Sequence, residues 1–128
     1  MKLLLDTCTF LWLVAEPQKL GERARVVLDD PVHEIVLSDV SILEVCLKWQ
    51  TGKLRLPDPP RRWVEENSTA WSLKRVGLAT EHAYRATELP DHHRDPFDRL
   101  LVAQAIVEGM TLVTPDPAVT GYPVATLW

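Results

Sequence analysis

The sequence has no long hydrophobic run, and this lack excludes a membrane-spanning helix. A span needs about 20 consecutive apolar residues, and no stretch of the 128 residues approaches that length. The opening segment MKLLLDTCTFLWLV has a lysine followed by leucines, but Asp6 interrupts the apolar run and no cleavage site of small residues follows. We therefore expect no signal peptide, no membrane contact and a cytoplasmic location.

Cysteine is scarce, and a surplus of basic residues is missing. The two cysteines, Cys8 and Cys46, each lie inside an apolar stretch and not at a spacing that binds zinc. Buried free thiols in a reducing compartment are the simplest interpretation. The formal net charge of −4 argues against binding of nucleic acid over the whole surface, although it allows a local basic groove.

Several common catalytic motifs are absent as well. The sequence has no glycine-rich phosphate loop, no dinucleotide-binding fingerprint and no hydrolase arrangement of serine, histidine and aspartate. It has no internal repeat and no low-complexity tail. A chain of 128 residues has the length of one domain, residues 1–128, and can bury roughly two-thirds of the surface that its unfolded form exposes.

The sequence does contain an alternation of short apolar strands with helical segments. Strands are expected where apolar residues run together, and helices where turn or capping residues precede a longer periodic segment. Such strands, separated by helices, predict a parallel sheet covered on both faces: an α/β fold, as a three-layer α/β/α sandwich with a short, mostly parallel central sheet. The expected strands are 2–6, 34–39, 110–116 and 122–128, with 74–79 a strand or connector, and the expected helices are 8–15, 21–30, 40–54, 58–71, 80–89 and 95–109.

Three of these strands end in an aspartate. LLLD ends at Asp6, IVLSD at Asp39 and LVTPD at Asp116. Because binding sites of open parallel sheets lie beyond the carboxyl ends of the strands, the three side chains should emerge at one edge. Each aspartate alone could cap the element that follows it. Three together favour a shared site, although capping could still account for Asp39.

Glu44 lies in the apolar context SILEVCLKW, where a carboxylate is costly unless it binds a cation or hydrogen-bond donors. One interpretation is a capping box from Ser41 to Glu44 at the start of the helix. A cap at Ser38 or Asp39 would instead place Glu44 about one turn into the helix, as a site residue. The sequence leaves these two interpretations about even.

The segment HHRDPFDR, residues 92–99, directly precedes the clearest helix of the chain. Asp95 suits the N-cap, Pro96 the first helical position and Asp98 the first turn, where the helix dipole favours a negative charge. A structural role would explain all three residues. If strand 110–116 packs beside the strands of Asp6 and Asp39, however, this helix start approaches the acidic edge, and Asp98 becomes a metal ligand.

The remaining charged residues of this segment have less specific roles. His92 and His93 could also be metal ligands, but solvated loop residues are the favoured interpretation, because hard-metal sites prefer oxygen ligands. Arg94 and Arg99 are expected to balance the acids or to contact phosphate, and Arg99 is the better candidate. Carboxylates that converge from distant parts of a chain are stable around one or two Mg²⁺ or Mn²⁺ ions, whose usual task in such a cluster is phosphodiester hydrolysis.

The chain resembles the PIN-domain ribonucleases, and more closely the VapC toxins of bacterial and archaeal toxin–antitoxin pairs. The matching segments are LLLDTCTFLWL, LSDVSILEVCLKWQTGKL, HHRDPFDRLLVAQAIVEGMTLVTPD and YPVATLW, which span nearly the whole chain in family order. DPFDRLLVAQA followed by LVTPD is the most specific of these. The resemblance implies metal ligation and catalysis by Asp6, Glu44, Asp98 and Asp116, a further part for Asp95, and support of the acids by the hydroxyls of Thr7 and Thr114.

The resemblance also implies a function and partners. The function is a Mg²⁺- or Mn²⁺-dependent endoribonuclease, the toxin of a toxin–antitoxin pair. The partners are an RNA substrate, a small antitoxin whose tail covers the active edge, and a second copy of the chain in a homodimer. Candidates for contact with the RNA backbone, with a solvated surface as the alternative, are Lys53, Arg55, Arg61, Arg62, Lys74 and Arg75.

Other functions remain open on the same fold. A catalytically silent PIN-fold binding module would be expected to lose one of the acids, and here all four positions are filled. A housekeeping RNA or DNA nuclease is the second alternative, although a flap nuclease needs extra segments to hold branched DNA. A phosphatase of the haloacid dehalogenase kind needs Asp-x-Asp, and the residue two beyond Asp6 is Cys8.

Overall fold

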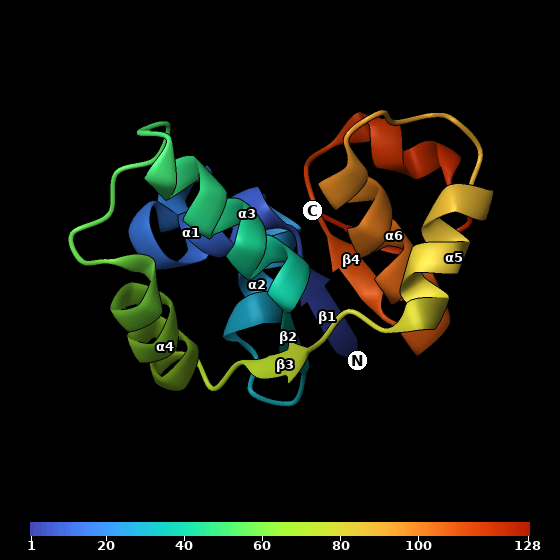
Figure 1. The fold of residues 1–128 in the computed structure, drawn as a ribbon. Helices are drawn as coiled ribbons and strands as arrows, with labels where there is room; N and C mark the ends of the chain where they lie inside the picture. The colour runs from blue at the N-terminus through green and yellow to red at the C-terminus, as the bar shows by residue number, and fades with distance from the viewer.

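A central sheet of five strands organises the protein, as a computed structural model of residues 1–128 shows (Figure 1). Every neighbouring pair of strands is parallel. Leu4, for example, pairs with Val36 on one side and with Leu112 on the other. The strands are β1 (Lys2–Leu5), β2 (Glu34–Ser38), β3 (Lys74–Val76), β4 (Thr111–Val113) and β5 (Thr126–Leu127), in the spatial order β3-β2-β1-β4-β5.

Helices cover both faces of the sheet. Figure 1 shows α1, α2 and α4 on one side of the strands and α5 and α6 on the other. The predicted three-layer α/β/α sandwich is confirmed, with a sheet that is entirely parallel. The helices are α1 (Thr7–Ala15), α2 (Glu22–Asp29), α3 (Asp39–Gln50), α4 (Pro60–Ala70), α5 (Thr80–Glu88) and α6 (Pro96–Glu108), joined by the short 3-10 helices η1 (Pro17–Lys19) and η2 (Pro117–Gly121).

The two faces of the sheet bury two separate hydrophobic cores. Leu3 and Leu5 of β1 point to one face, into a core that contains Phe10 of α1. Leu4 points to the other face and packs in a core with Leu101 of α6. Each of these leucines is fully buried and stabilises the fold by roughly 1.5–3 kcal/mol. Because β1 is apolar on both faces, the first polar side chain after Lys2 lies beyond its carboxyl end.

The limits of α6 follow from local signals at its two ends. The carboxylate of Asp95 accepts a hydrogen bond from the backbone N–H of Phe97 at 2.9 Å, and Pro96 occupies the first helical position. At the other end Gly109 adopts the left-handed conformation, with φ of 65°, and its N–H bonds back to the helix. These signals fix both ends of α6, and the first of them fixes the place of Asp98.

No helix of the protein combines the length and the apolar character that a bilayer span requires.

Candidate active site

Asp6 and Asp116 come together because they follow two neighbouring strands. Asp6 directly follows β1, and Asp116 lies a short way beyond β4. The Asp6 carboxylate is buried and accepts a hydrogen bond from the N–H of Thr9 at 2.8 Å. The Asp116 carboxylate accepts one from the N–H of Ala118 at 2.9 Å. Both aspartates therefore cap the helix that follows and also line the same edge of the sheet.

Glu44 enters the site from α3. Ser38 caps this helix through its hydroxyl, so the alternative of a capping box from Ser41 is wrong and Glu44 lies inside the helix. The Glu44 side chain is buried, and its Oε1 accepts a hydrogen bond from the hydroxyl of Thr7 at 2.5 Å. Its Oε2 lies 2.8 Å from the ammonium nitrogen of Lys48, one turn further along the helix. A buried carboxylate with two fixed partners is held in one orientation.

The start of α6 brings two further acids to this place. Asp95, the N-cap of α6, and Asp98, in its first turn, both line a pocket of about 220 Å³ at the carboxyl edge of the sheet. Thr114 supports the same edge, because its hydroxyl accepts a hydrogen bond from the N–H of Asp116 at 3.1 Å. The lining of this acidic pocket consists of Asp6, Thr7, Cys8, Leu11, Glu44, Lys48, Asp95, Asp98 and Asp116.

Burial and like charge change the acidity of groups in the acidic pocket. Burial, together with the nearby carboxylate of Asp95, raises the pKa of Asp98 from 3.8 to about 6. His93 opposes this rise, while Glu44 and Asp6 add to it. The ionised form of the Asp98 carboxylate is thus disfavoured first by its burial and then by the negative charges near it.

Two other groups of the pocket are shifted in the same direction. Burial and the adjacent Asp6 carboxylate raise the pKa of the Cys8 thiol to about 12, so Cys8 remains a neutral thiol. The hydrogen bond to Glu44 raises the pKa of Lys48, although partial burial opposes the rise. The ammonium group of Lys48 therefore stays charged beside Glu44.

His93 and Lys48 are site residues that the sequence did not single out. His93 was expected in solvent, yet its Nε2 lies 2.9 Å from Oδ2 of Asp116 and 3.0 Å from Oδ2 of Asp98. Lys48 carries a usable signal, since it follows Glu44 by four residues and must share its helix face. His93 carries none, because the conformation of the loop before α6 determines where its ring lies.

Two expected positions are not in the pocket. Arg99 turns away from the acids, and its guanidinium donates to the backbone oxygens of Ala86 at 2.7 Å and Pro90 at 3.1 Å. These donors close the end of α5, so contact of Arg99 with phosphate stays an expectation that the contacts within the protein do not favour. Asp39 begins α3 at the same edge, but it is half exposed and lies 3.6 Å from Arg75.

The donor set of the acidic pocket suits a hard divalent cation. Five carboxylates and the hydroxyl of Thr7 line it, and Mg²⁺ and Mn²⁺ prefer such oxygen ligands. Carboxylate oxygens of Asp98 and Asp116 lie within 4.8 Å of each other, and Nε2 of His93 lies beside both. A cation bound there would offset both the burial of Asp98 and the like charges around it, which raise its pKa. The residues present thus fit a metal site.

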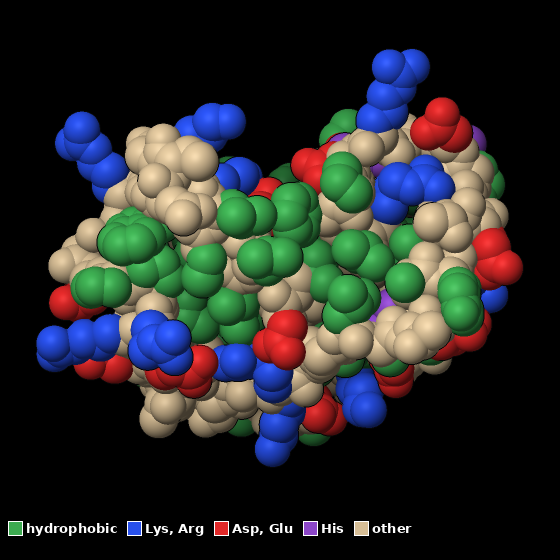
Figure 2. Space-filling model, in the orientation of Figure 1, with side chains coloured by type: hydrophobic (Ala, Val, Ile, Leu, Met, Phe, Trp, Pro, Cys, Tyr) green, Lys and Arg blue, Asp and Glu red, His purple; other side chains and the backbone are tan.

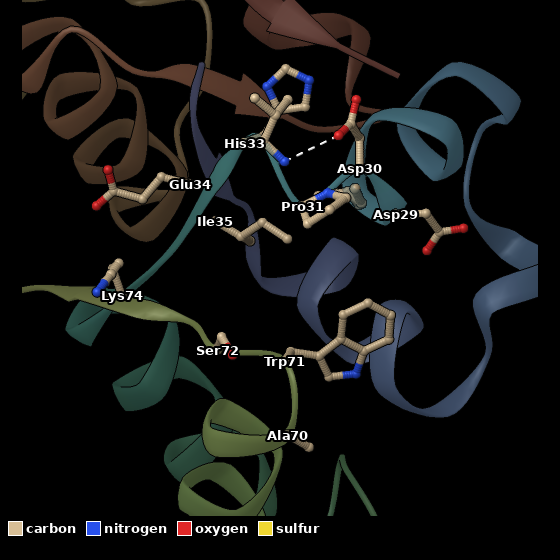
Figure 3. A pocket seen from close by; sticks show the side chains of 12 residues that line it. Asp29, Asp30, Pro31, His33, Glu34, Ile35, Ala70, Trp71, Ser72 and Lys74 are labelled. Carbon is tan, nitrogen blue, oxygen red and sulfur yellow. Dashed lines mark hydrogen bonds between the residues drawn. The ribbon is translucent and has the colours of Figure 1, made fainter.

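The largest cavity of the molecule lies elsewhere. It has a volume of about 830 Å³ and opens at the opposite edge of the sheet, where β2 begins (Figure 3). His33, Ile35 and Trp71 are among its lining residues, and none of the converging acids reaches it. Size usually favours a cavity as the binding site, but here the chemistry of the side chains favours the smaller acidic pocket.

Comparison with known proteins identifies the family of the chain. The PIN domain matches residues 3–121. The chain belongs to the PIN domain family. This PIN-domain chain is 32% identical over 114 residues to Ribonuclease VapC22 of Mycobacterium tuberculosis, a match that covers 88% of this chain and 85% of the relative. The resemblance read from the sequence is therefore confirmed.

Solved structures agree at the level of the fold. The crystal structure of VapBC2 from Rickettsia felis bound to a DNA fragment from the promoter superposes with a TM-score of 0.74 and 15% identity, covering 100% of this chain and 99% of that one. The DNA-bound VapBC of Salmonella typhimurium gives a TM-score of 0.71 at 15% identity, covering 99% and 97%. Both similarities concern the PIN fold.

Proposed function

We propose that this PIN-domain protein is a Mg²⁺- or Mn²⁺-dependent endoribonuclease and the toxin of a toxin–antitoxin pair. The observation that carries the proposal is the convergence of Asp6, Glu44, Asp98 and Asp116 in one pocket at the carboxyl edge of the sheet. The similarity to a VapC ribonuclease supports RNA as the substrate. The similarity to VapBC structures supports a small antitoxin as the partner, and the cytoplasm is the compartment in which both would meet RNA.

The residues of the pocket have separate tasks in this reaction. Asp6, Glu44, Asp98 and Asp116 would hold a Mg²⁺ or Mn²⁺ ion, which would activate the attacking water and neutralise charge on the scissile phosphate. Thr7 holds Glu44, and the N–H of Thr9 holds Asp6, so both carboxylates face the pocket in fixed orientations. Lys48 is the basic residue of the pocket lining, and it can contact a phosphate oxygen from its place beside Glu44.

Helix termini add to the affinity for phosphate. Both α1 and α6 begin at the acidic pocket, since Asp6 caps one and Asp95 caps the other. The N-terminus of a helix carries a partial positive charge and unpaired N–H groups. Such ends favour the carboxylates that hold a cation and also an incoming phosphate group.

RNA cleavage by purified protein tests the proposal. We expect cleavage of a pool of cellular RNA with Mg²⁺ or Mn²⁺ and none with chelator, and sequencing of the new ends would identify the substrate. Asp6→Asn should reduce cleavage at least about 100-fold, because it removes a charged ligand. Its circular dichroism spectrum should stay unchanged, because asparagine caps a helix as well as aspartate. Asp95→Asn should lose only part of the activity.

The outcome of this experiment separates the candidate functions. Full activity of a clean Asp6→Asn preparation would contradict the nuclease proposal. A silent wild type that still binds RNA would favour the binding module. An active enzyme whose expression leaves growth unaffected would indicate a housekeeping nuclease. The toxin proposal requires growth arrest on expression and recovery when the neighbouring small protein is co-expressed.

An exposed hydrophobic surface supports the proposal that the protein associates with other protein chains. Hydrophobic side chains gather over α3 and over the side formed by α5 and α6 (Figure 2). Leu43 and Leu47 of α3 are 52% and 41% exposed, and Leu47 lines a groove beside Glu44 and Phe97. Exposed apolar patches of this kind mark sites of protein association. We assign the α3 surface to a second copy of the chain, in a homodimer.

A further inference from the structure

His93 links two carboxylates that belong to different elements. Its Nε2 donates to Oδ2 of Asp116 at 2.9 Å and lies 3.0 Å from Oδ2 of Asp98. Asp98 belongs to α6, while Asp116 caps η2. The imidazole ring therefore lies where the two acids would otherwise face each other without a partner.

The hydrogen bond at Nδ1 of His93 determines which of the two ring nitrogens carries the hydrogen. The backbone N–H of Asp95 donates to Nδ1 of His93 at 3.1 Å. Nδ1 must therefore offer its lone pair, and in the neutral ring the hydrogen is on Nε2. Nε2 can then donate to the acids but has no lone pair for a cation. The geometry makes His93 a hydrogen-bond donor to the carboxylates and not one of the ligands.

The loop before α6 holds this ring through buried contacts of its backbone. The N–H of His93 donates to the hydroxyl of Tyr122 at 2.8 Å, and its carbonyl accepts from Arg99 at 3.2 Å. Tyr122 is buried and receives a further hydrogen bond from Arg99 at 3.3 Å. The ring of His92 packs edge-on against Tyr122. A Cβ added at Gly121 would lie only 3.0 Å from the nearest atom of the His92 ring. The loop thus has little freedom to place His93 elsewhere.

We propose that His93 is the positioning residue of the metal site: its Nε2–H fixes Asp98 and Asp116 in the orientation that receives a divalent cation. The inference rests on the metal dependence proposed above. Oδ1 of Asp98 has no hydrogen-bond partner within the protein and remains available to the cation, whereas Oδ2 faces His93. Donors that orient ligating carboxylates typically contribute roughly 10–100-fold to metal affinity.

Mn²⁺ binding, followed by the electron paramagnetic resonance signal of the free ion, tests this role without an activity measurement. His93→Ala should bind Mn²⁺ roughly 10–100-fold more weakly than wild type. His93→Gln should recover part of that loss, because its amide N–H can reach the same carboxylates. His92→Ala is the matched control, since it disturbs the packing on Tyr122 without contacting the acids, and it should keep wild-type affinity.

Each contrary result has a distinct meaning. Wild-type affinity in His93→Ala would overturn the positioning role, and so would an equal loss in His92→Ala, which would show that order in the loop is what matters. A nitrogen bound directly to Mn²⁺ in wild type, detected by pulsed resonance and lost in His93→Ala, would make His93 a ligand and overturn the proposal. Failure of wild type to bind Mn²⁺ would refute the metal site itself, and with it any residue that positions it. Melting curves in chelator confirm that each variant is folded.

Discussion

Asp98 combines two roles that affect stability in opposite directions. It lies in the first turn of α6, where a negative charge is favourable by roughly 0.3–1 kcal/mol. Burial, together with the nearby carboxylates of Asp95, Glu44 and Asp6, raises its pKa to about 6. Burial and like charge together thus oppose the favourable helix dipole at this position. The carboxylate therefore costs the metal-free fold stability at neutral pH.

The pH dependence of stability follows from this shift. Between its ordinary pKa of 3.8 and the folded value of about 6, Asp98 binds more protons in the folded than in the unfolded state. Stability of the metal-free protein therefore falls as pH rises through this window and stays lowered above it. Because the group is partly exposed, the loss at pH 7 is on the order of 1 kcal/mol.

We predict that in chelator at pH 7 the melting temperature of Asp98→Asn is a few degrees higher than that of wild type. At pH 4 the two proteins should melt at the same temperature. The variant removes the crowded charge, and at pH 4 the wild-type carboxyl is already mostly protonated. Mn²⁺ should raise the melting temperature of wild type by mass action and that of Asp98→Asn much less. Thermal melts with and without Mn²⁺ measure both effects. A lower melting temperature of Asp98→Asn at both pH values would indicate a helix-start residue without a metal role.

The sequence predicted the positions of residues that are set by their immediate neighbours, while their roles stay predictions. Asp6 and Asp116 could be placed because each ends an apolar strand, and the ends of parallel strands share an edge. Asp95 and Asp98 could be placed because the following proline marks the first turn of a helix. His93 and Arg99 could not, because hydrogen bonds to Tyr122, far along the chain, determine which way these side chains point.

At the level of elements, α6 places Asp98 in the acidic pocket with its first turn, and the helix ends at Gly109. Gly109 has φ of 65°, a conformation that costs a residue with a Cβ roughly 1 kcal/mol. An added Cβ would meet nothing within 4 Å, so the cost of a substitution is conformational and not steric. The stability of α6 and the chemistry at its start are thus separable.

We predict that Gly109→Ala lowers the free energy of unfolding by about 1 kcal/mol, while Mn²⁺ affinity stays at the wild-type value. Gly109→Asn should lose less, because asparagine tolerates the left-handed region. Urea denaturation gives the free energies, and the Mn²⁺ titration gives the affinity. An unchanged stability in Gly109→Ala would show that the end of α6 unwinds or rearranges at no cost.

The boundaries of elements were predicted best where capping chemistry is local. Ser38 and Asp95 cap α3 and α6 as side-chain acceptors, and the sequence marks both. The last expected strand, 122–128, shortens to Thr126–Leu127, because residues 122–125 form an irregular bend after η2. Strand length at a sheet edge depends on how far the neighbour β4 extends, and this is not a local property.

At the level of the whole molecule, the exposed hydrophobic surface of α3 lies beside the site. The proposed homodimer would cover Leu43 and Leu47, whose surfaces are more than a third exposed in the single chain. Removal of this surface from water is the main driving force for association. A dimer through α3 would therefore bring two acidic pockets close to one interface.

We predict that the double change Leu43→Glu and Leu47→Glu converts a dimer to a monomer in light scattering, because charges cannot be buried at an apolar contact. The fold should survive, since both side chains are exposed in one chain. Val32→Glu is the control: Val32 is 73% exposed and lines the cavity at the opposite edge of the sheet. A monomeric wild type, or a double variant that remains dimeric, would contradict the assignment of this surface.

The double use of Asp6, Asp95 and Asp116 as helix caps has a genetic consequence. Asparagine caps a helix as well as aspartate does, and one transition in the first base of an aspartate codon produces it. In a gene whose product stops growth, such a change at Asp6 or Asp116 would silence the enzyme and leave a folded protein with its partner surfaces intact. Survivors of selection against the active protein should therefore be rich in aspartate-to-asparagine alleles at these two positions but not at Asp95, whose change leaves part of the activity, and the silent alleles would act as decoys that sequester the antitoxin.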